Sequence, residues 1–166
     1  LKYLSSARAG NVVGGGDTAR NRLIPDIFKS ISNKTQLKIR NLNHVRPWQH
    51  VLDPLFGYLI LAKKNFKNGV LSSEWNFGPN SNRKKRVIDI VNDFKKFNPK
   101  LKIKILNTNN NKESKSLNLN SNKAKNLLKW KSRINHKQMI NLTNEEYLFR
   151  GSKLDFYNQR LNHIKK

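Results

Sequence analysis

Three arginines stand beside apolar residues that would hold their backbones in place, and their guanidinium groups could bind phosphate. Arg46 lies in the string H-V-R-P-W-Q-H-V, between a loop and an extended segment, and Arg22 and Arg40 have similar surroundings. A guanidinium presents its N–H donors as a planar fork that fits phosphate oxygens. The competing interpretation is an ordinary solvated arginine. For Arg46 taken alone that interpretation is favoured, and the other two could equally face water.

A glycine-rich stretch follows the first predicted strand, in the string A-R-A-G-N-V-V-G-G-G-D of Ala7–Asp17. Asn11 stands where such a strand delivers a side chain to the mouth of a sheet. Gly14–Ala19 fits the pattern G-x-G-x-x-A of dinucleotide-binding loops, which also needs an acidic residue at the end of the next strand. The next predicted strand ends in Arg40 and Asn41, with no acid nearby. A structural turn is therefore favoured over a dinucleotide site.

No reaction centre is evident among the residues of this chain. The four histidines show no metal-ligand spacing, so no metal site is predicted. None of the four tyrosines begins a Tyr-x-x-x-Lys motif. There is also no serine with a plausible base and no obvious carboxylate pair for acid–base catalysis. The residues taken alone indicate binding groups without catalytic ones.

The chain is strongly basic, with 34 Lys and Arg against 10 Asp and Glu in 166 residues, a formal charge of +24. Such a charge is compatible with nucleic-acid binding. However, the basic residues are spread along the sequence, and Lys and Asn are abundant throughout, as an A/T-rich coding sequence would produce. Compositional drift is therefore preferred. The absence of cysteine fits a reducing compartment, and no apolar run is long enough for a membrane span.

Strand and helix patterns alternate along the chain, which predicts an α/β fold. Strands are expected at 2–9, 37–40, 48–52, 74–78 and 101–106. Helices are expected at 21–32, 53–66, 85–97, 121–130 and 136–150, followed by an exposed helix from 151. Loops are expected at 10–18, 41–47 and 108–116. In the second helix, Asp53 and Pro54 suggest an N-cap and a first helical residue, and apolar residues on nearly all sides predict burial.

Several strings occur in the order and spacing found in CDP-glucose 4,6-dehydratases, which are extended short-chain dehydrogenase/reductases. They are R-A-G-N-V-V-G-G-G-D (8–17), R-L-I-P-D-I (22–27), I-R-N (39–41), R-P-W-Q-H-V-L-D-P-L-x-G-Y-L (46–59) and W-N-F-G-P (75–79). The string E-S-x-S-L-x-L-x-S-x-K-A-x-x-x-L-x-W (113–130) resembles the C-terminal region of that family. The string R-P-W-Q-H-V best distinguishes this subfamily from other sugar-nucleotide enzymes, because those usually carry R-D-x-I/L-H/Y-V at this place. The resemblance covers residues 2–150.

The resemblance implies the C-terminal part of an NAD(P)-binding Rossmann-type enzyme together with its small α+β substrate-binding domain. The family is expected to be cytoplasmic and commonly dimeric, and it converts CDP-glucose to CDP-4-dehydro-6-deoxy-glucose and water with NAD. Its catalytic tyrosine, acidic pair and NAD loop are absent from this sequence. A missing N-terminal half or upstream chain would therefore bind most of the NAD, and the fragment alone would be inactive. The alternatives are another sugar-nucleotide epimerase or dehydratase, or a non-catalytic basic remnant that binds nucleotide sugars or nucleic acid.

The resemblance also implies a set of substrate-binding residues and no catalytic residue. Asn11 would hydrogen-bond the pyrophosphate or sugar, and Arg46 would clamp the pyrophosphate. Arg40 falls where relatives place an aromatic residue against the base, so its guanidinium would stack on or bond to cytosine. The remaining positions are Arg22, Leu23 and Ile24 along the nucleotide pocket and Asn76 at its border. A buried pyrophosphate needs such donors because each unsatisfied charge is costly.

Five segments are expected within this single fragment. They are a late core strand with its loop (1–16), the substrate-domain helix and strands (17–52), a return helix and strand (53–78), a C-terminal substrate-binding subdomain (79–150) and a tail helix (151–166). Thr18 and Asn21 depart from the aromatic residue and the Asp of relatives, which affects the details of the pocket. Apolar faces of 2–9 and 53–66 that lack their usual partners predict poor solubility or self-association.

Overall fold

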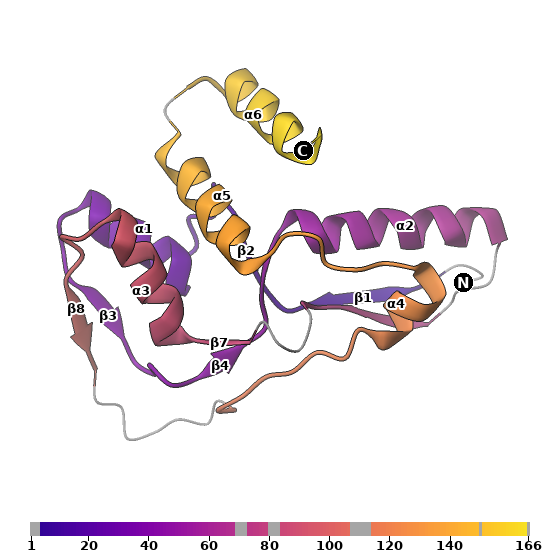
Figure 1. Cartoon of the computed structure of the whole chain (residues 1–166), viewed down its shortest axis with the longest axis horizontal. Coiled ribbons are helices and arrows are strands. Elements are labelled where there is room, and N and C mark those ends of the chain that lie inside the picture. Colours follow the sequence, from indigo (N-terminus) through magenta and orange to yellow (C-terminus); the bar gives the residue numbers. More distant parts are fainter. Residues whose placement is uncertain (1–3, 69–72, 80–83, 107–113, 150, 166) are drawn as a thin grey trace.

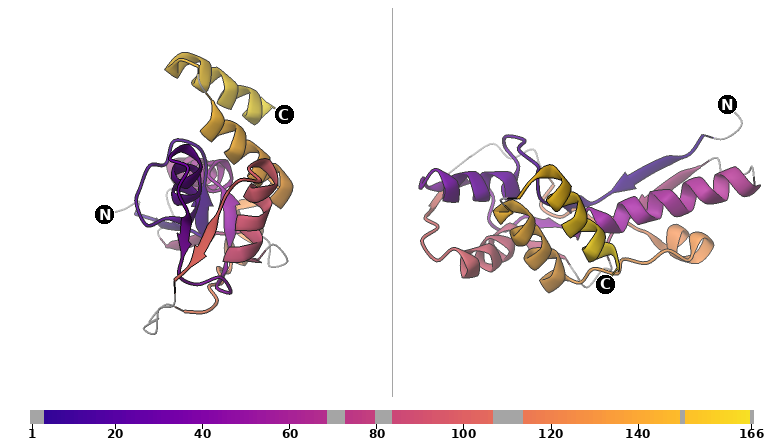
Figure 2. Two further views of the ribbon diagram at one scale, coloured as in Figure 1. Left: turned by 90° about the vertical axis from the view of Figure 1, so that its left-hand side faces the viewer. Right: turned by 90° about the horizontal axis from the view of Figure 1, so that it is seen from above.

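The computed structural model describes residues 4–68, 73–79, 84–106, 114–149 and 151–165, which form a mixed α/β structure (Figures 1 and 2). Its strands are β1 (Ser6–Ala9), β2 (Asn11–Val13), β3 (Leu37–Ile39), β4 (Val45–Arg46), β5 (Trp48–His50), β6 (Glu74–Phe77), β7 (Lys85–Arg86) and β8 (Ile103–Ile105). Its helices are α1 (Leu23–Ser32), α2 (Leu52–Asn68), α3 (Val87–Phe97), α4 (Asn122–Leu128), α5 (His136–Leu148) and α6 (Lys153–Lys165).

One hydrophobic core lies between the parallel pair β1–β6 and the helices α2 and α4 (Figure 1). This α2 core consists of Leu61, Trp75, Phe77, Ala124, Leu128 and Trp130. Phe77 and Trp130 meet edge to face, with ring centroids 5.1 Å apart. Gly57 of α2 lets the helix approach closely, because a Cβ there would lie 2.3 Å from the ring of Phe77. No helix within the described ranges combines the length and apolar character needed to cross a membrane.

The second core joins the helices α1, α3 and α5 to the parallel pairs β2–β5 and β3–β8. This α1 core consists of Val13, Ile24, Ile27, Phe28, Leu37, Ile39, Trp48, Ile90, Val91, Phe94, Leu101, Met139 and Ile140. In α1 and α3 the buried residues recur three and four positions apart, which places them on one face of each helix. The predicted amphipathic helices in these regions are therefore confirmed, and β4 and β7 add an antiparallel pair.

Three short strands lie where the sequence predicted other structure. β2 lies within the loop predicted at 10–18, β4 within the loop predicted at 41–47, and β7 within the helix predicted at 85–97. The cause is non-local pairing: Val45 pairs with Arg86, and Asn11 pairs with Trp48. Arg86 is extended and its backbone N–H donates to Asp89 at 3.0 Å, so α3 begins at Val87. Part of the loop predicted at 108–116 lies outside the described residues.

Two predictions for α2 are wrong. Asp53 lies inside the first helical turn instead of at the N-cap, and its carboxylate accepts hydrogen bonds from a distant segment. The helix is also not buried on all sides. Its outer face exposes Leu55, Phe56, Leu59 and Phe66, which are 46%, 43%, 68% and 93% exposed. The hydrophobic core of the described chain covers one face of α2. On the other face these side chains stay exposed, although Arg133 lies over the ring of Phe56. The expected poor solubility stays a prediction.

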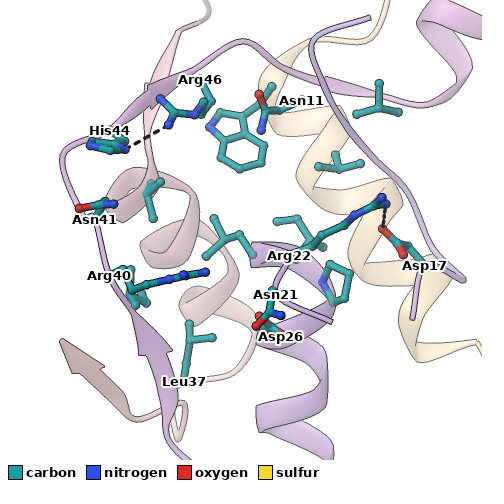
Figure 3. Close-up of a pocket in the computed structure, with 18 of the residues that line it drawn as sticks. Asn11, Asp17, Asn21, Arg22, Asp26, Leu37, Arg40, Asn41, His44 and Arg46 are labelled. Carbon is teal, nitrogen blue, oxygen red and sulfur yellow. Dashed lines mark hydrogen bonds and ion pairs between the residues drawn. The ribbon is translucent and has the colours of Figure 1, made fainter. Parts of the chain in front are cut away.

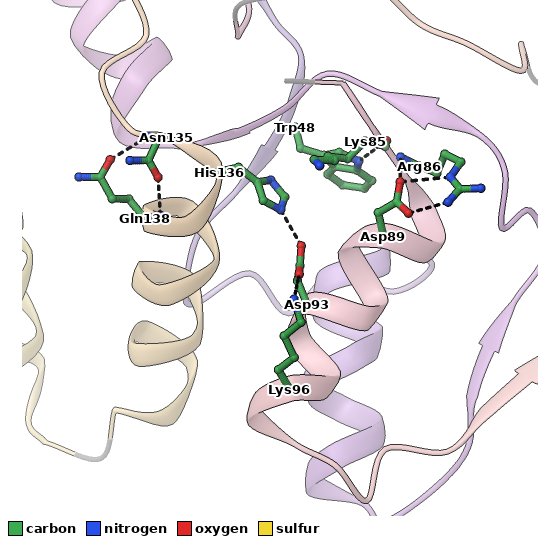
Figure 4. Close-up of polar contacts among 9 residues, drawn as sticks. All are labelled: Trp48, Lys85, Arg86, Asp89, Asp93, Lys96, Asn135, His136 and Gln138. Carbon is green, nitrogen blue, oxygen red and sulfur yellow. Dashed lines mark hydrogen bonds and ion pairs between the residues drawn. The ribbon is translucent and has the colours of Figure 1, made fainter. Parts of the chain in front are cut away.

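A polar cluster connects α3 to α5 (Figure 4). The Asp93 carboxylate lies 2.7 Å from Nε2 of His136 and 2.7 Å from Nζ of Lys96. At the start of α5, the side chain of Asn135 accepts from the backbone N–H of Gln138, and the side chain of Gln138 accepts from that of Asn135. This reciprocal capping satisfies two backbone donors that no helical carbonyl can reach. Helix α5 therefore has a defined start and a fixed position against α3.

The Asp93 cluster predicts a loss of stability in acid. Burial alone would raise the pKa of Asp93, but the hydrogen bonds from His136 and Lys96 outweigh it, so the pKa is lowered. A lowered pKa means that the fold favours the carboxylate. Its contribution is present above the ordinary pKa of about 3.9 and is lost as the pH falls through the lower folded-state value. We expect urea unfolding between pH 7 and pH 3 to show this decline, and Asp93→Asn to reduce it.

The matched control is Asp26, because burial raises its pKa despite opposing contributions from Lys29, the backbone of Asn21 and Arg40. Asp26→Asn should change the pH dependence of unfolding in the opposite sense to Asp93→Asn. Superimposable pH profiles for the Asp93→Asn variant and the parent chain would contradict the assignment.

Candidate functional site

A pocket of about 520 Å³ opens between the start of α1, the strands β2 and β3, and the segment that leads into β5 (Figure 3). Positive groups predominate among its charged lining residues. These are Arg22, Lys38, Arg40 and Arg46, against Asp17 and Asp26. Apolar residues also line the pocket, among them Trp48, Val87 and the first residues of α1. A pocket of this size, with cationic groups beside apolar side chains, suits a small anionic ligand.

The pocket brings together most of the residues that the sequence indicated. Six of the seven assigned substrate-binding positions line it: Asn11, Arg22, Leu23, Ile24, Arg40 and Arg46. Asn76 is the exception, since it lies on β6 opposite Arg8 and its amide donates to the carbonyl of Asn120 at 3.3 Å. Their placement is a structural fact, whereas the binding role of all seven residues stays a prediction.

The position of Asn11 depends on a close approach of two backbones. Its N–H donates to the carbonyl of Pro47 at 3.0 Å, and β2 then pairs with β5, with Asn11 opposite Trp48. A Cβ at Gly10 would lie 2.5 Å from the same carbonyl oxygen. Glycine is therefore needed at position 10 for β2 to reach β5. This pairing places Asn11 on the pocket wall.

Arg46 is nearly buried, at 9% exposed, and its guanidinium is fixed by the surrounding chain. Nη1 donates to the carbonyls of Val45 and Ser114, each at 3.0 Å. Nη2 lies 3.1 Å from Nδ1 of His44. Because these contacts hold the guanidinium plane against the pocket wall, Arg46 is a preoriented cation. The simple solvated arginine, which was favoured for this residue alone, is therefore wrong.

Arg22 sits at the rim, where its Nη1 lies 3.1 Å from the carboxylate of Asp17. The two side chains are 67% and 32% exposed, so this ion pair contributes little to stability. Asp17 also accepts from the backbone N–H of Ala19 at 2.9 Å. Arg22 immediately precedes α1, whose first N–H groups favour negative charge. The rim is thus held by weak contacts that a ligand can replace.

Arg40 approaches the pocket from the opposite side, beyond the end of β3, and extends toward Asn21 in Figure 3. Asp26 lies below Asn21 at the same end of the pocket. Arg40 attracts Asp26, but burial has the larger effect and raises the pKa of that carboxyl. The pocket therefore has an arginine at each end, with Arg46 fixed and Arg40 exposed.

Two lining residues, Tyr147 and His44, had no sequence pattern that placed them in the pocket. Tyr147 of α5 reaches the pocket from more than a hundred residues away, donates its hydroxyl to the carbonyl of Asp17 at 2.7 Å and stacks on Phe28 at 4.0 Å. Burial and the nearby charges of Asp17 and Glu146 raise the pKa of Tyr147. His44 was noted only for its lack of metal-ligand spacing. Only the tertiary fold could have identified these two residues.

The glycine-rich loop does not fit a bound dinucleotide. The N–H of Gly15 donates to the carboxylate of Glu146, and Arg160 donates to the carbonyl of Gly15 at 2.8 Å. A Cβ at Gly15 would lie 2.2 Å from Cβ of Glu146, so the protein itself fills the space that a pyrophosphate would need. The preferred interpretation as a structural turn agrees with this geometry. Within the described ranges there is also no cluster of His, Asp and Glu that could hold a metal.

The fold is similar to part of the fold of several sugar-nucleotide epimerases and dehydratases whose structures were solved with NAD. UDP-glucuronic acid 4-epimerase from Bacillus cereus, in complex with UDP-glucuronic acid and NAD, matches at a TM-score of 0.72 and 16% identity over 84% of this chain and 43% of its own. dTDP-glucose 4,6-dehydratase from Bacillus anthracis, in complex with NAD, matches with a TM-score of 0.69 and 20% identity. This match covers 86% of this chain and 43% of the dehydratase chain. UDP-glucose-4-epimerase from Stenotrophomonas maltophila, with bound NAD and formylated UDP-arabinopyranose, matches with a TM-score of 0.73 and 16% identity. This match covers 86% of this chain and 46% of the epimerase chain.

In sequence, the chain resembles CDP-glucose 4,6-dehydratase of Salmonella typhimurium, with 54% identity over 89 residues. The match includes 53% of this chain, and the chain spans about a quarter (25%) of the relative's length. No protein-family model matches. The resemblance predicted from the sequence motifs is confirmed, and the extent of the matches is consistent with a C-terminal portion of such an enzyme.

Proposed function

We propose that this chain is the substrate-binding portion of a CDP-glucose 4,6-dehydratase and that its pocket holds CDP-glucose. The observation that supports the proposal is the convergence of Asn11, Arg22, Leu23, Ile24, Arg40 and Arg46 on one pocket, from separate segments of the chain. The family motifs in the sequence indicate the same six positions.

In this proposal the diphosphate lies against Arg46 and Asn11, where a fixed cation and an amide can share its oxygens. The base lies toward Arg40, whose planar guanidinium can stack on or bond to cytosine. Leu23 and Ile24 provide the apolar contact, and Arg22 leaves Asp17 to close over the ligand. Asn76, which lies outside the pocket, is proposed to contribute only in the assembled enzyme.

The chemistry of the whole enzyme is also part of the proposal. The three solved relatives described above contain NAD, while the glycine loop of this chain is filled by Glu146. We propose that NAD and the proton-transferring groups belong to residues beyond these 166, in a preceding half or a separate chain, and that the complete enzyme is a cytoplasmic dimer. The chain alone would then bind CDP-glucose without converting it.

The proposed pocket predicts that Arg46→Ala weakens CDP-glucose binding by at least about tenfold, since it removes a charge-assisted contact to the diphosphate. Isothermal titration calorimetry on the purified chain measures this directly, with turnover in the presence of NAD followed in the same samples. Arg46→Lys tests the fork, because lysine retains the charge without the paired donors. Arg8→Ala is the matched control, since Arg8 is exposed on β1 and outside the pocket.

Equal affinities for CDP-glucose in the parent chain and Arg46→Ala, with both shown to be folded by circular dichroism, would contradict the placement of the diphosphate.

The second candidate ligand is a different nucleotide sugar, because UDP-sugar epimerases match the fold as well as the dTDP-glucose dehydratase does. Titrations with UDP-glucose and dTDP-glucose in parallel distinguish these possibilities. Preference for either over CDP-glucose would favour the second candidate.

A further inference from the structure

Next to the nucleotide pocket lies a second groove that the proposed function leaves unexplained. Its volume is about 880 Å³, and it runs between α1, the turn that follows α1, β3 and the segment before β8. Five of its thirteen lining residues are cations, nearly twice the proportion of 34 in 166 for the whole chain. They are Lys29, Lys34, Lys38, Arg40 and Lys102. Asp26 is the only acid in the lining. We call this the lysine groove.

The pairing of β3 with β8 concentrates this charge further. Lys38 stands directly opposite Lys104, and Arg40 and Lys102 follow the same alternation on the exposed face of the two strands. Leu37 and Ile39 point to the opposite side and are buried. Like charges directly opposite each other destabilise a strand pair. Within the part of the chain that the structure describes, no carboxylate lies within ion-pair distance of these cations.

The backbone of the lysine groove is ordered by hydrogen bonds between its two sides. The N–H of Leu37 donates to the carbonyl of Lys102 at 2.8 Å, and that of Leu106 donates to the carbonyl of Ile39 at 2.8 Å. At the end of α1 the N–H of Thr35 donates to the carbonyl of Ser30 at 2.9 Å. The exposed cations therefore project from an ordered backbone, and the fold gathers them from segments more than sixty residues apart in sequence.

We propose that the lysine groove binds a chain of phosphates and recognises it without its bases, whether as inorganic polyphosphate or as the backbone of a single-stranded nucleic acid. Spaced lysines neutralise successive phosphates and release their counterions. The thirteen lining residues include no aromatic side chain on which a base could stack. The groove shares Lys38 and Arg40 with the nucleotide pocket, so the two ligands would lie side by side. Lys29, Lys34 and Lys102 line this groove but not the nucleotide pocket, and they distinguish the two sites.

The test uses a triple variant, Lys29→Gln with Lys34→Gln and Lys102→Gln, because these lysines line the groove and not the nucleotide pocket. Inorganic tripolyphosphate is titrated by calorimetry, and a labelled oligothymidylate is titrated by fluorescence anisotropy at several salt concentrations. The matched control is Lys63→Gln with Lys67→Gln and Lys137→Gln, which removes the same charge from exposed positions on α2 and α5. CDP-glucose binding is measured for every variant.

We expect the groove variant to bind tripolyphosphate about tenfold more weakly and to lower the salt slope for the oligonucleotide by about 2, or roughly 0.7 per lysine. The control should change both values much less. Equal losses in the two triple variants would overturn the proposal, because net charge alone would then explain binding. A preference among oligonucleotides of different base composition would also overturn it. So would loss of tripolyphosphate binding in Arg46→Ala but not in the groove variant. Failure of CDP-glucose to bind any variant would contradict only the proposed function.

Discussion

Replacing Glu146 by alanine is expected to lower the free energy of unfolding by about 3 kcal/mol, because it removes one partner of a buried ionic cluster. The side chain of Glu146 has no exposed surface. One carboxylate oxygen accepts from the N–H of Gly15 and lies 3.5 Å from Nε2 of His50, and the other lies 3.5 Å from Nε of Arg160. Alanine would leave the N–H of Gly15 without its acceptor, and it would remove the negative charge beside His50 and Arg160.

The matched variant for Glu146→Ala is Glu146→Gln, which retains the shape and one acceptor oxygen but loses the charge. Burial alone would raise the pKa of Glu146, but the close contact with His50, the hydrogen bond from the N–H of Gly15 and the attraction of Arg160 outweigh it and lower the pKa. The charged form is therefore the favoured one, and glutamine should recover only part of the loss. Urea denaturation followed by circular dichroism measures the free energy of unfolding of both Glu146 variants. Glu74→Gln, on the exposed surface, controls for the loss of one negative charge. Unchanged stability of Glu146→Ala would contradict this account.

The Glu146 cluster also connects the C-terminal helices to the pocket proposed to bind CDP-glucose. Glu146 holds Gly15, while Gly14 and Asp17 on either side of that glycine line the pocket. The neighbouring Tyr147 bonds to the carbonyl of Asp17 and stacks on Phe28 of α1. Loss of Glu146 should therefore weaken ligand binding as well as stability, even though its own carboxylate makes no part of the pocket lining. Binding and unfolding measured on one sample would show both effects.

The sequence predicted those parts of the site that local patterns and family motifs define. The amphipathic spacing of Ile24, Ile27 and Phe28 identified α1, and the motifs around Asn11 and Arg46 identified two positions on the pocket wall. The motifs identify these two positions along the chain, although Asn11 and Arg46 lie on the short strands β2 and β4 where the sequence predicted loops. The fold then brings their segments together.

Other features depend on contacts between distant segments, which no local pattern reveals. The strands β4 and β7 contain two residues each, and they exist only because Val45 meets Arg86. Tyr147 enters the pocket because α5 packs beside α1 and α3. The basic residues looked evenly dispersed in the sequence, yet Lys38 and Lys104 stand opposite each other in the fold. The interpretation of the charge as compositional drift therefore could not foresee the lysine groove.

Asp53→Ala is also expected to lower the free energy of unfolding by about 3 kcal/mol, because Asp53 joins the two hydrophobic cores. Its carboxylate accepts from the hydroxyl of Ser132 at 2.5 Å and from the backbone N–H groups of Arg133 and Ile134 at 2.9 and 3.4 Å. Its backbone carbonyl accepts from the indole of Trp130 at 3.1 Å. Removing this buried acceptor takes three hydrogen bonds away from their donors, which lowers the free energy of unfolding. The residues from Ser132 to Ile134 would then lose these contacts with the start of α2, whereas the bond from the Trp130 indole to the backbone carbonyl would remain.

The position of this segment determines how the loss should appear. Trp130 belongs to the α2 core and Ile134 packs against the α1 core, so Asp53 stabilises the passage between them. Asp53→Asn retains one acceptor oxygen and should lose less stability than Asp53→Ala, while Ser132→Ala should cost about 1 kcal/mol, the usual value for one hydrogen bond. If the two cores uncouple, tryptophan fluorescence and far-ultraviolet circular dichroism will report different urea midpoints for Asp53→Ala but coincident ones for the parent chain. Coincident midpoints with an unchanged free energy would show that Asp53 does not join the cores.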